Sequence, residues 1–123
     1  MIKLPVLCVA ALFGVAISAG AATGKGDAAK GKALFEEKCA GCHGKDGKAE
    51  TDLGKKLKPH PANLSDTKAM AEKTQAEIVK IITDGGKASG RSPLMAAWGT
   101  KLGEDGVRDV VEHMKQICKC AFK

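Results

Sequence analysis

The chain has 123 residues, enough for one small domain, and carries a formal net charge of +6 at neutral pH. This charge comes almost entirely from lysine: Arg91 and Arg108 are the only arginines, and no nucleic-acid recognition motif accompanies them, which argues against nucleic-acid binding. Aromatic residues make up only 3% of the chain, and small domains often hold together through a metal, disulfides or a cofactor, so we expect something other than side chains to fill part of the core.

The first 21 residues have the pattern of a secretory signal peptide. A lysine near the start precedes an uncharged apolar run, and small residues follow at Ala19 and Ala21. This order predicts export and cleavage after Ala21, which leaves residues 22–123 as the mature domain. The alternative is a retained membrane anchor, because residues 4–24 carry no charge, but the glycines, proline and alanines there make a poor spanning helix.

A first helix is predicted over residues 28–39. Asp27 precedes it, and an aspartate at this position can accept hydrogen bonds from the first free backbone amides of a helix. Small and apolar residues of the segment fall on one helical face: Ala28, Gly31, Leu34 and Phe35.

The sequence Cys-Ala-Gly-Cys-His occupies residues 39–43 at the end of this helix. Two cysteines three positions apart lie on one side of a helical turn, so both sulfurs could bond to the two vinyl groups of one haem. The histidine directly after Cys42 could then place its ring under the iron as an axial ligand. The motif therefore predicts covalent attachment of one haem c through Cys39 and Cys42, with His43 as the proximal iron ligand.

Three other uses of these cysteines are conceivable. A thioredoxin-like redox motif needs a βαβ unit, whereas no alternating strand pattern occurs in this sequence. A four-cysteine zinc site could recruit Cys118 and Cys120, but it would leave His43 without a role. A simple disulfide between Cys39 and Cys42 would suit an exported protein. Haem attachment is favoured because it gives all three residues of the motif a function.

The middle of the chain combines two helices with two long loops rich in Gly, Pro and Lys. Thr74 and Glu77 form a capping-box pattern ahead of an apolar segment, and the glycines after Asp84 predict where that helix ends. Ser65 is the predicted cap of a shorter helix at residues 66–73. Loops this long are unusual unless they surround a ligand. They cover residues 43–64 and 85–100.

The last helix has the clearest pattern in the chain. Glu104 and Asp105 lie in its first turn and lysines lie near its end, which suits the helix dipole. One residue separates Cys118 from Cys120, so a direct disulfide is strained, although an oxidising compartment permits it, and their pairing stays open. Apolar residues recur at steps of three and four: Val107, Val110, Val111, Met114, Ile117 and Cys118.

With the haem motif between these helices, the sequence resembles the class I cytochromes c over nearly the whole mature chain. In that family a glycine and an aromatic residue precede the motif, as Gly31 and Phe35 do here. Val110 and His113 match the positions of the last helix that pack against them, with histidine in place of the usual aromatic residue. Residues 61–66, "PANLSD", resemble the segment after the haem loop in small bacterial members. The prediction is an all-α, class I cytochrome c-like fold of three to five helices around one covalently bound haem.

The occupant of the second axial position of the iron decides the chemistry. Met114 is best explained as core packing on the last helix, and Met70 as core or surface of a short one. Met95 lies in a loop that could place its thioether on a haem face. The resemblance implies a distal methionine at this place, with Trp98 packed beside the haem. Met95 is therefore the predicted sixth ligand, and His60 is the alternative.

An iron held by histidine and methionine is closed to oxygen and peroxide and exchanges single electrons. We therefore expect a periplasmic one-electron carrier between redox proteins, not an enzyme, with no stable membrane insertion after signal cleavage. A haem enzyme or gas sensor with an open sixth position is one alternative, and a zinc-binding structural module is the other. Lysines around the haem could form a basic rim for acidic partners or simply keep the surface solvated. They are Lys45, Lys48, Lys55, Lys56, Lys58, Lys87 and Lys101.

Overall fold

The computed structural model describes residues 24–123, and every regular element among them is a helix. The predicted signal peptide, residues 1–21, lies outside the described residues. Within residues 24–123, no helix combines the length and the apolar character needed to cross a membrane. The helices are α1 (Ala28–Lys38), α2 (Ala40–His43), α3 (Asp52–Lys56), α4 (Thr67–Ala71), α5 (Gln75–Ala88) and α6 (Gly99–Cys118).

The all-α fold is confirmed, although the described part of the chain has six helices where the sequence predicted three to five. The additional elements are short: α2 has four residues and α3 has five. Such short helices show no periodic apolar pattern, because periodicity needs several turns to become visible.

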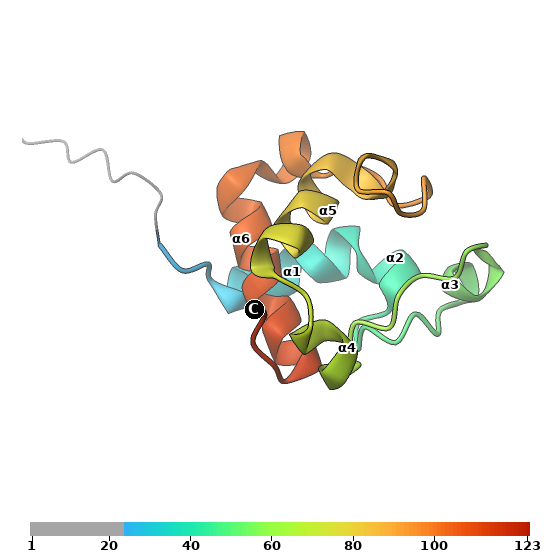
Figure 1. Cartoon of the computed structure of the whole chain (residues 1–123), viewed down its shortest axis with the longest axis horizontal. Coiled ribbons are helices and arrows are strands. Elements are labelled where there is room, and N and C mark those ends of the chain that lie inside the picture. The colour runs from blue at the N-terminus through green and yellow to red at the C-terminus, as the bar shows by residue number, and fades with distance from the viewer. Residues whose placement is uncertain (1–23) are drawn as a thin grey trace, which may run out of the picture.

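The core lies where α1 crosses α6, to one side of α2 and α3 (Figure 1). An ideal Cβ on Gly31 would lie 1.8 Å from the backbone oxygen of Asp109 and 2.9 Å from the backbone nitrogen of Val110, so the two backbones touch there. One turn later, the ring of Phe35, 1% exposed, meets the ring of His113 edge to face, with centroids 5.3 Å apart. The structure confirms the predicted contact between the two helices.

Both long helices are interrupted at a glycine with positive φ. Gly85 breaks α5 at φ 81°, and Gly103 breaks α6 at φ 66°. The regular part of α5 therefore runs from the capping box of Thr74 and Glu77 to the predicted glycine stop. The regular part of α6 begins at Glu104, where the sequence predicted its first turn.

Two short elements differ from the expectation. The cap of α4 is Asp66, whose carboxylate accepts a backbone hydrogen bond from this helix, and not Ser65, whose hydroxyl donates to the Asn63 side chain. Inside the loop predicted for residues 43–64, Thr51 caps helix α3. In both cases a polar side chain satisfies the free amides of a helix start.

A disulfide joins Cys118 and Cys120, whose Cα atoms are 5.2 Å apart. The tail beyond it pairs with the α4–α5 connection: the Lys123 amide donates to the Lys73 carbonyl, and the Gln75 amide donates to the Lys123 carbonyl. The disulfide removes Cys118 and Cys120 from the four-cysteine zinc site considered above. Among residues 24–123, no three His, Cys, Asp or Glu side chains are placed to share a metal ion.

Candidate haem site

The Cys-Ala-Gly-Cys-His motif forms the single turn of α2 and the residue before it. The amides of Cys42 and His43 both donate to the Cys39 carbonyl, at 3.2 and 3.0 Å, so the three residues share one helical turn. Cys39 and Cys42 form no disulfide, and both are half-buried. The structure thus places two free thiols on one turn, as covalent attachment of a haem requires.

The environment of Cys39 is unlike that of a redox-active cysteine. Burial raises the pKa of the Cys39 thiol to about 11, and the neighbouring Cys42 adds to this shift. Enzymes that exchange thiols and disulfides lower the pKa of their cysteine, because the thiolate is the nucleophile. Cys39 is therefore a neutral thiol at physiological pH, which argues against the thioredoxin-like alternative.

The ring of His43 lies in a sheltered position. Its Nδ1 atom is buried and makes no hydrogen bond, which calls for an explanation in a folded protein. Burial lowers the pKa of His43, and the backbone carbonyl of Ala62 opposes this shift by attracting the ring proton. A neutral imidazole is the form that binds a metal, and the proton then stays on the nitrogen that does not bind it.

The loop that carries Met95 folds back onto α5. The Gly86 amide donates to the Met95 carbonyl at 2.9 Å, and the Trp98 amide donates to the Ile82 carbonyl at 2.8 Å. A Cβ on Gly86 would lie 2.0 Å from the Ser92 backbone oxygen and 3.0 Å from the Met95 Cβ, so only glycine allows this approach. These contacts hold the backbone of Met95 in place and leave its side chain half-buried.

The structure brings two of the predicted ligands together, because His43 and Met95 are in contact. His60, the alternative sixth ligand, is exposed, and its Nδ1 atom lies 2.9 Å from the Pro61 carbonyl oxygen. Two further methionines are buried in the core: Met70 and Met114.

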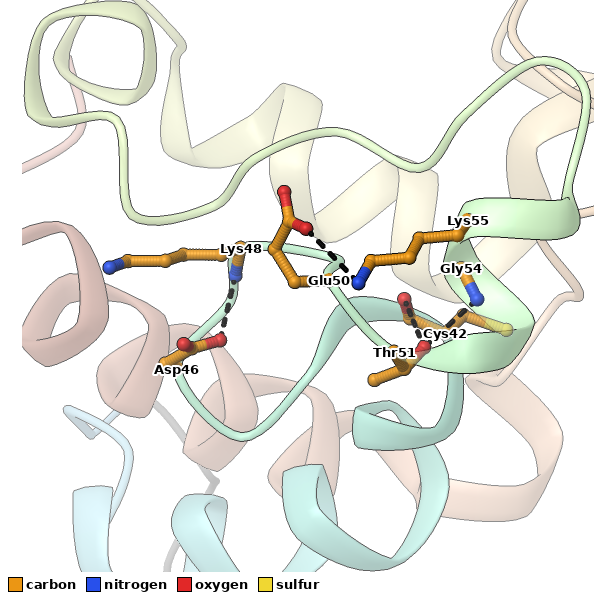
Figure 2. Close-up of polar contacts among 7 residues, drawn as sticks. All are labelled: Cys42, Asp46, Lys48, Glu50, Thr51, Gly54 and Lys55. Carbon is orange, nitrogen blue, oxygen red and sulfur yellow. Dashed lines mark hydrogen bonds and ion pairs between the residues drawn. The ribbon is translucent and has the colours of Figure 1, made fainter.

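Sequence reasoning missed the residues that hold α2 from the outside. The Thr51 hydroxyl donates to the Gly41 carbonyl at 2.7 Å, and the Ala49 amide donates to the His43 carbonyl at 2.7 Å. Figure 2 shows Thr51 between the carbonyl group of Cys42 and helix α3. A threonine at a helix start is a recognisable cap, but its second partner, ten residues earlier, leaves no pattern in the sequence.

This arrangement of free thiols, histidine and methionine in an all-α domain defines the class of the c-type cytochromes. The family described as cytochrome C oxidase, cbb3-type, subunit III matches residues 26–114. The chain belongs to this family. It is a cytochrome c domain with covalently bound haem c and its iron, among the electron-transfer domains of the cytochrome c class.

Two curated relatives cover the same part of the chain. The cbb3-type cytochrome c oxidase subunit FixP of Azorhizobium caulinodans is 37% identical over 99 residues, and FixP of Bradyrhizobium diazoefficiens is 29% identical over 99 residues. Each alignment covers 80% of this chain. The chain spans only 30% of the length of either relative, so it corresponds to one portion of those subunits.

Solved structures show the same fold. The KustC0563 c-type cytochrome is 26% identical with a TM-score of 0.59, covering 71% of this chain and 95% of that one. A chain of the Kuenenia stuttgartiensis reducing HAO-like protein complex Kustc0457/Kustc0458 has a TM-score of 0.60 at 24% identity, covering 76% of this chain and 44% of that one. The second likeness concerns the fold alone.

The described residues fit a covalently bound haem. Two free thiols lie on one turn, and the following histidine has a buried nitrogen without a partner. Two large apolar side chains are also left in solvent: Leu53 is 50% exposed on α3, and Leu94, next to Met95, is 52% exposed. Exposed apolar side chains at these two places suit residues that cover an apolar ring.

Proposed function

We propose that this domain is a one-electron carrier that works between larger redox proteins outside the plasma membrane. In this proposal, Cys39 and Cys42 attach the haem, and His43 and Met95 hold its iron. The bound haem iron supplies a centre that takes up and gives up one electron. The observation that carries the proposal is the turn of α2, with two free, half-buried thiols and a histidine in contact with Met95.

The surroundings of His43 support its role as the proximal ligand. A histidine that binds iron through Nε2 keeps its proton on Nδ1 and usually donates it to a carbonyl or carboxylate. The Ala62 carbonyl lies near the His43 ring and raises its pKa, so it is the group that would accept that proton once a bound haem orients the ring; in this structure Nδ1 itself has no hydrogen-bond partner. Such a bond fixes the tautomer of the ring and makes it a stronger ligand.

The fixed backbone of Met95 supports this residue over His60 as the sixth ligand. The Met95 backbone is bonded to α5 through Gly86, whereas His60 is exposed and close to its own neighbour, Pro61. A thioether ligand would also favour reduced iron compared with a second histidine, and so would raise the midpoint potential of the centre.

The visible spectrum of the holoprotein tests the ligands. We expect a c-type haem spectrum with a weak far-red charge-transfer band in the oxidised state, which marks iron held by histidine and methionine. Replacing Met95 with alanine should abolish this band and let the reduced iron bind carbon monoxide. The His60→Ala variant should keep the band and, like the wild type, should not bind carbon monoxide. A wild-type protein that already binds carbon monoxide would instead indicate a gas sensor or haem enzyme, and a colourless protein containing zinc would refute the proposal.

Export and cleavage after Ala21 are part of the same proposal, because the first residues have a signal-peptide pattern. Intact-mass measurement of the protein from the periplasmic fraction under denaturing conditions tests it. We expect a chain that starts at Ala22 and carries one covalently bound haem. A chain that keeps residues 1–21 and sediments with membranes would support the anchor alternative.

The methionine loop has the charge needed for an acidic partner. Residues 85–101 contain three basic residues and no acidic one, and all three side chains are exposed. Within residues 24–123 none of the three forms an ion pair, whereas Lys45 and Lys55, near the haem motif, pair with Glu36 and Glu50. The Lys101 amino group also lies 5.0 Å from the centre of the Trp98 ring. The three are Lys87, Arg91 and Lys101.

Electron transfer to ferricyanide, a small anionic oxidant, measures this local field. We expect Lys87→Glu/Arg91→Glu to slow the reaction severalfold at low ionic strength, because the variant repels the anion. The matched control, Lys25→Glu/Lys30→Glu near the start of α1, makes the same change of net charge and should have a smaller effect. The difference should vanish near 1 M salt, where charges are screened within about 3 Å. Equal effects of both variants would show that net charge alone matters.

A further inference from the structure

The carbonyl groups in the last turn of a helix need partners outside the helix. Because α2 has only four residues, this applies to all of its carbonyls. The segment that follows α2 supplies the partners. They are the Gly44 amide for Ala40 at 2.9 Å, the Thr51 hydroxyl for Gly41 at 2.7 Å, and the Ala49 amide for His43 at 2.7 Å. The Cys42 carbonyl lies 3.4 Å from the same Thr51 hydroxyl.

Thr51 is the only side chain in this set, and it acts in two directions. Its hydroxyl donates to the Gly41 carbonyl of α2 and accepts from the Gly54 amide of α3 at 2.9 Å. Figure 2 shows the hydroxyl between Cys42 and Gly54. One oxygen atom therefore joins the carbonyl end of the haem-attachment turn to the amide end of the next helix.

The two helices are also in close backbone contact at this point. An ideal Cβ on Gly54 would lie 2.6 Å from the Cys42 carbonyl oxygen and 2.5 Å from the Ala49 carbonyl oxygen. Only a residue without a side chain lets the first turn of α3 sit directly against α2. Apart from α3, α2 packs against α1.

We infer that Thr51 is the positioning residue of the haem-attachment turn: its hydroxyl fixes the orientation of α2, and with it Cys42 and His43, against α3. This inference rests on the proposed attachment of haem at Cys39 and Cys42. A single helical turn is not stable by itself, so its orientation depends on what holds its ends. The branched side chain of threonine has few χ1 rotamers, which keeps the hydroxyl in place.

The experiment compares holoprotein variants that remove or keep a single threonine hydroxyl. Thr51→Val removes the hydroxyl and keeps the branched shape, and Thr51→Ser keeps the hydroxyl. Thr67→Val is the matched control, because the part-buried Thr67 hydroxyl also donates to a backbone carbonyl, that of Cys118, at 2.6 Å. The readouts are the hydrogen exchange of the His43 and Gly44 amides and the midpoint potential of the haem.

In Thr51→Val we expect the His43 and Gly44 amides to exchange at least tenfold faster, because α2 opens locally more often. The midpoint potential should fall, since water that reaches this side of the haem stabilises the more highly charged oxidised iron. Thr51→Ser should stay close to the wild type in both readouts. Thr67→Val should leave both unchanged, although it removes an equivalent bond elsewhere.

The inference is overturned if Thr51→Val keeps both readouts at wild-type values, or if Thr67→Val changes them equally. Loss of haem from Thr51→Val, with haem retained by Thr51→Ser and Thr67→Val, supports it; loss from all three overturns it. Gly54→Ala is a second variant that keeps the hydroxyl but forces α3 away from Cys42, and it should also speed exchange at His43. A wild-type protein without haem on Cys39 and Cys42 would refute the proposed function instead.

Discussion

His113 lies in the contact between α1 and α6, at a position where the class I cytochromes c usually have an aromatic residue. The residue is 7% exposed, and both ring nitrogens are buried without a hydrogen bond. Burial lowers its pKa, and Lys32 lowers it further, while the side chains of Gln116 and Glu36 act in the opposite direction. Its neutral ring packs as an aromatic residue would, and its charged form is destabilised there.

This environment should make the stability of the protein depend on pH. Because the pKa of His113 is lower in the folded than in the unfolded state, its contribution is fully present above about pH 6.5 and is lost as the pH falls below that value. We expect His113→Phe to remove this component, so that the variant loses less stability than the wild type between pH 7.5 and 5.5. Denaturant unfolding of both holoproteins at pH 7.5 and 5.5 measures this loss of stability. His60→Gln is the control, because His60 is exposed. An equal pH dependence of wild type and His113→Phe would contradict the expectation.

Gly31 illustrates how a single missing side chain sets a helix contact. A methyl group there would overlap the backbone of Asp109, which cannot rotate away as a side chain could. We expect Gly31→Ala to destabilise the holoprotein by roughly 1–3 kcal/mol, the usual cost of overpacking. Gly24→Ala is the control, because a Cβ at Gly24 meets no atom within 4 Å. Thermal unfolding of the two variants should separate them clearly, and similar midpoints would count against this packing.

At the scale of elements, the disulfide between Cys118 and Cys120 joins the end of α6 to the C-terminal tail. Lys119 adopts the left-handed conformation that ends the helix, and the tail then pairs with the backbone on both sides of the α4–α5 connection through Lys123. The Thr67 hydroxyl also holds the Cys118 carbonyl. The disulfide thus limits the freedom of a short segment that fastens α4 and α5 to α6.

Removing the disulfide should therefore loosen the tail. We expect Cys118→Ala/Cys120→Ala to lower the free energy of unfolding by about 1–2 kcal/mol, as for a small closed loop. Hydrogen exchange at the Lys123 and Gln75 amides should rise, while the haem spectrum stays unchanged. Treating the wild type with a thiol reductant should have the same effect, because thioether bonds to haem resist it. Unchanged exchange at Lys123 would contradict this role.

At the scale of the whole molecule, the core of residues 24–123 contains few large side chains, and Phe35 is the one buried Phe, Tyr or Trp among them. Its apolar interior is built around Phe35, the valines of α6 and a few residues of α4 and α5. Leu53 and Leu94 remain exposed beside the haem motif and Met95. We expect the haem to complete this core, because a buried cofactor adds apolar contacts that the few large side chains do not supply.

The haem-free protein should therefore lack a cooperative thermal transition. Cys39→Ala/Cys42→Ala, produced without attached haem, tests this by calorimetry and circular dichroism. We expect a broad, non-cooperative loss of structure, whereas the holoprotein melts in one sharp step. A sharp transition of the haem-free variant would mean that the side chains alone complete the core.

Local patterns in the sequence predicted α1, α5 and the regular part of α6, together with their caps at Asp27 and Thr74. These features depend on residues within one or two turns of each other, so the sequence records them directly. The helix α3 was missed because an element of five residues is too short to show a period. The cap of α4 was assigned to Ser65 instead of Asp66, because both residue types cap helices and the two are adjacent.

The sequence by itself determined the helical class, the haem motif at residues 39–43 and the candidate sixth ligand, since each rests on the spacing of neighbouring residues and on the family resemblance they support. Only the tertiary structure decided the rest. It paired Cys118 with Cys120, buried His113 against Phe35, and placed the Thr51 hydroxyl on the Gly41 carbonyl. Contacts of this kind depend on how separate helices and loops meet in space, and a backbone carbonyl that accepts a distant side chain looks the same in the sequence as any other.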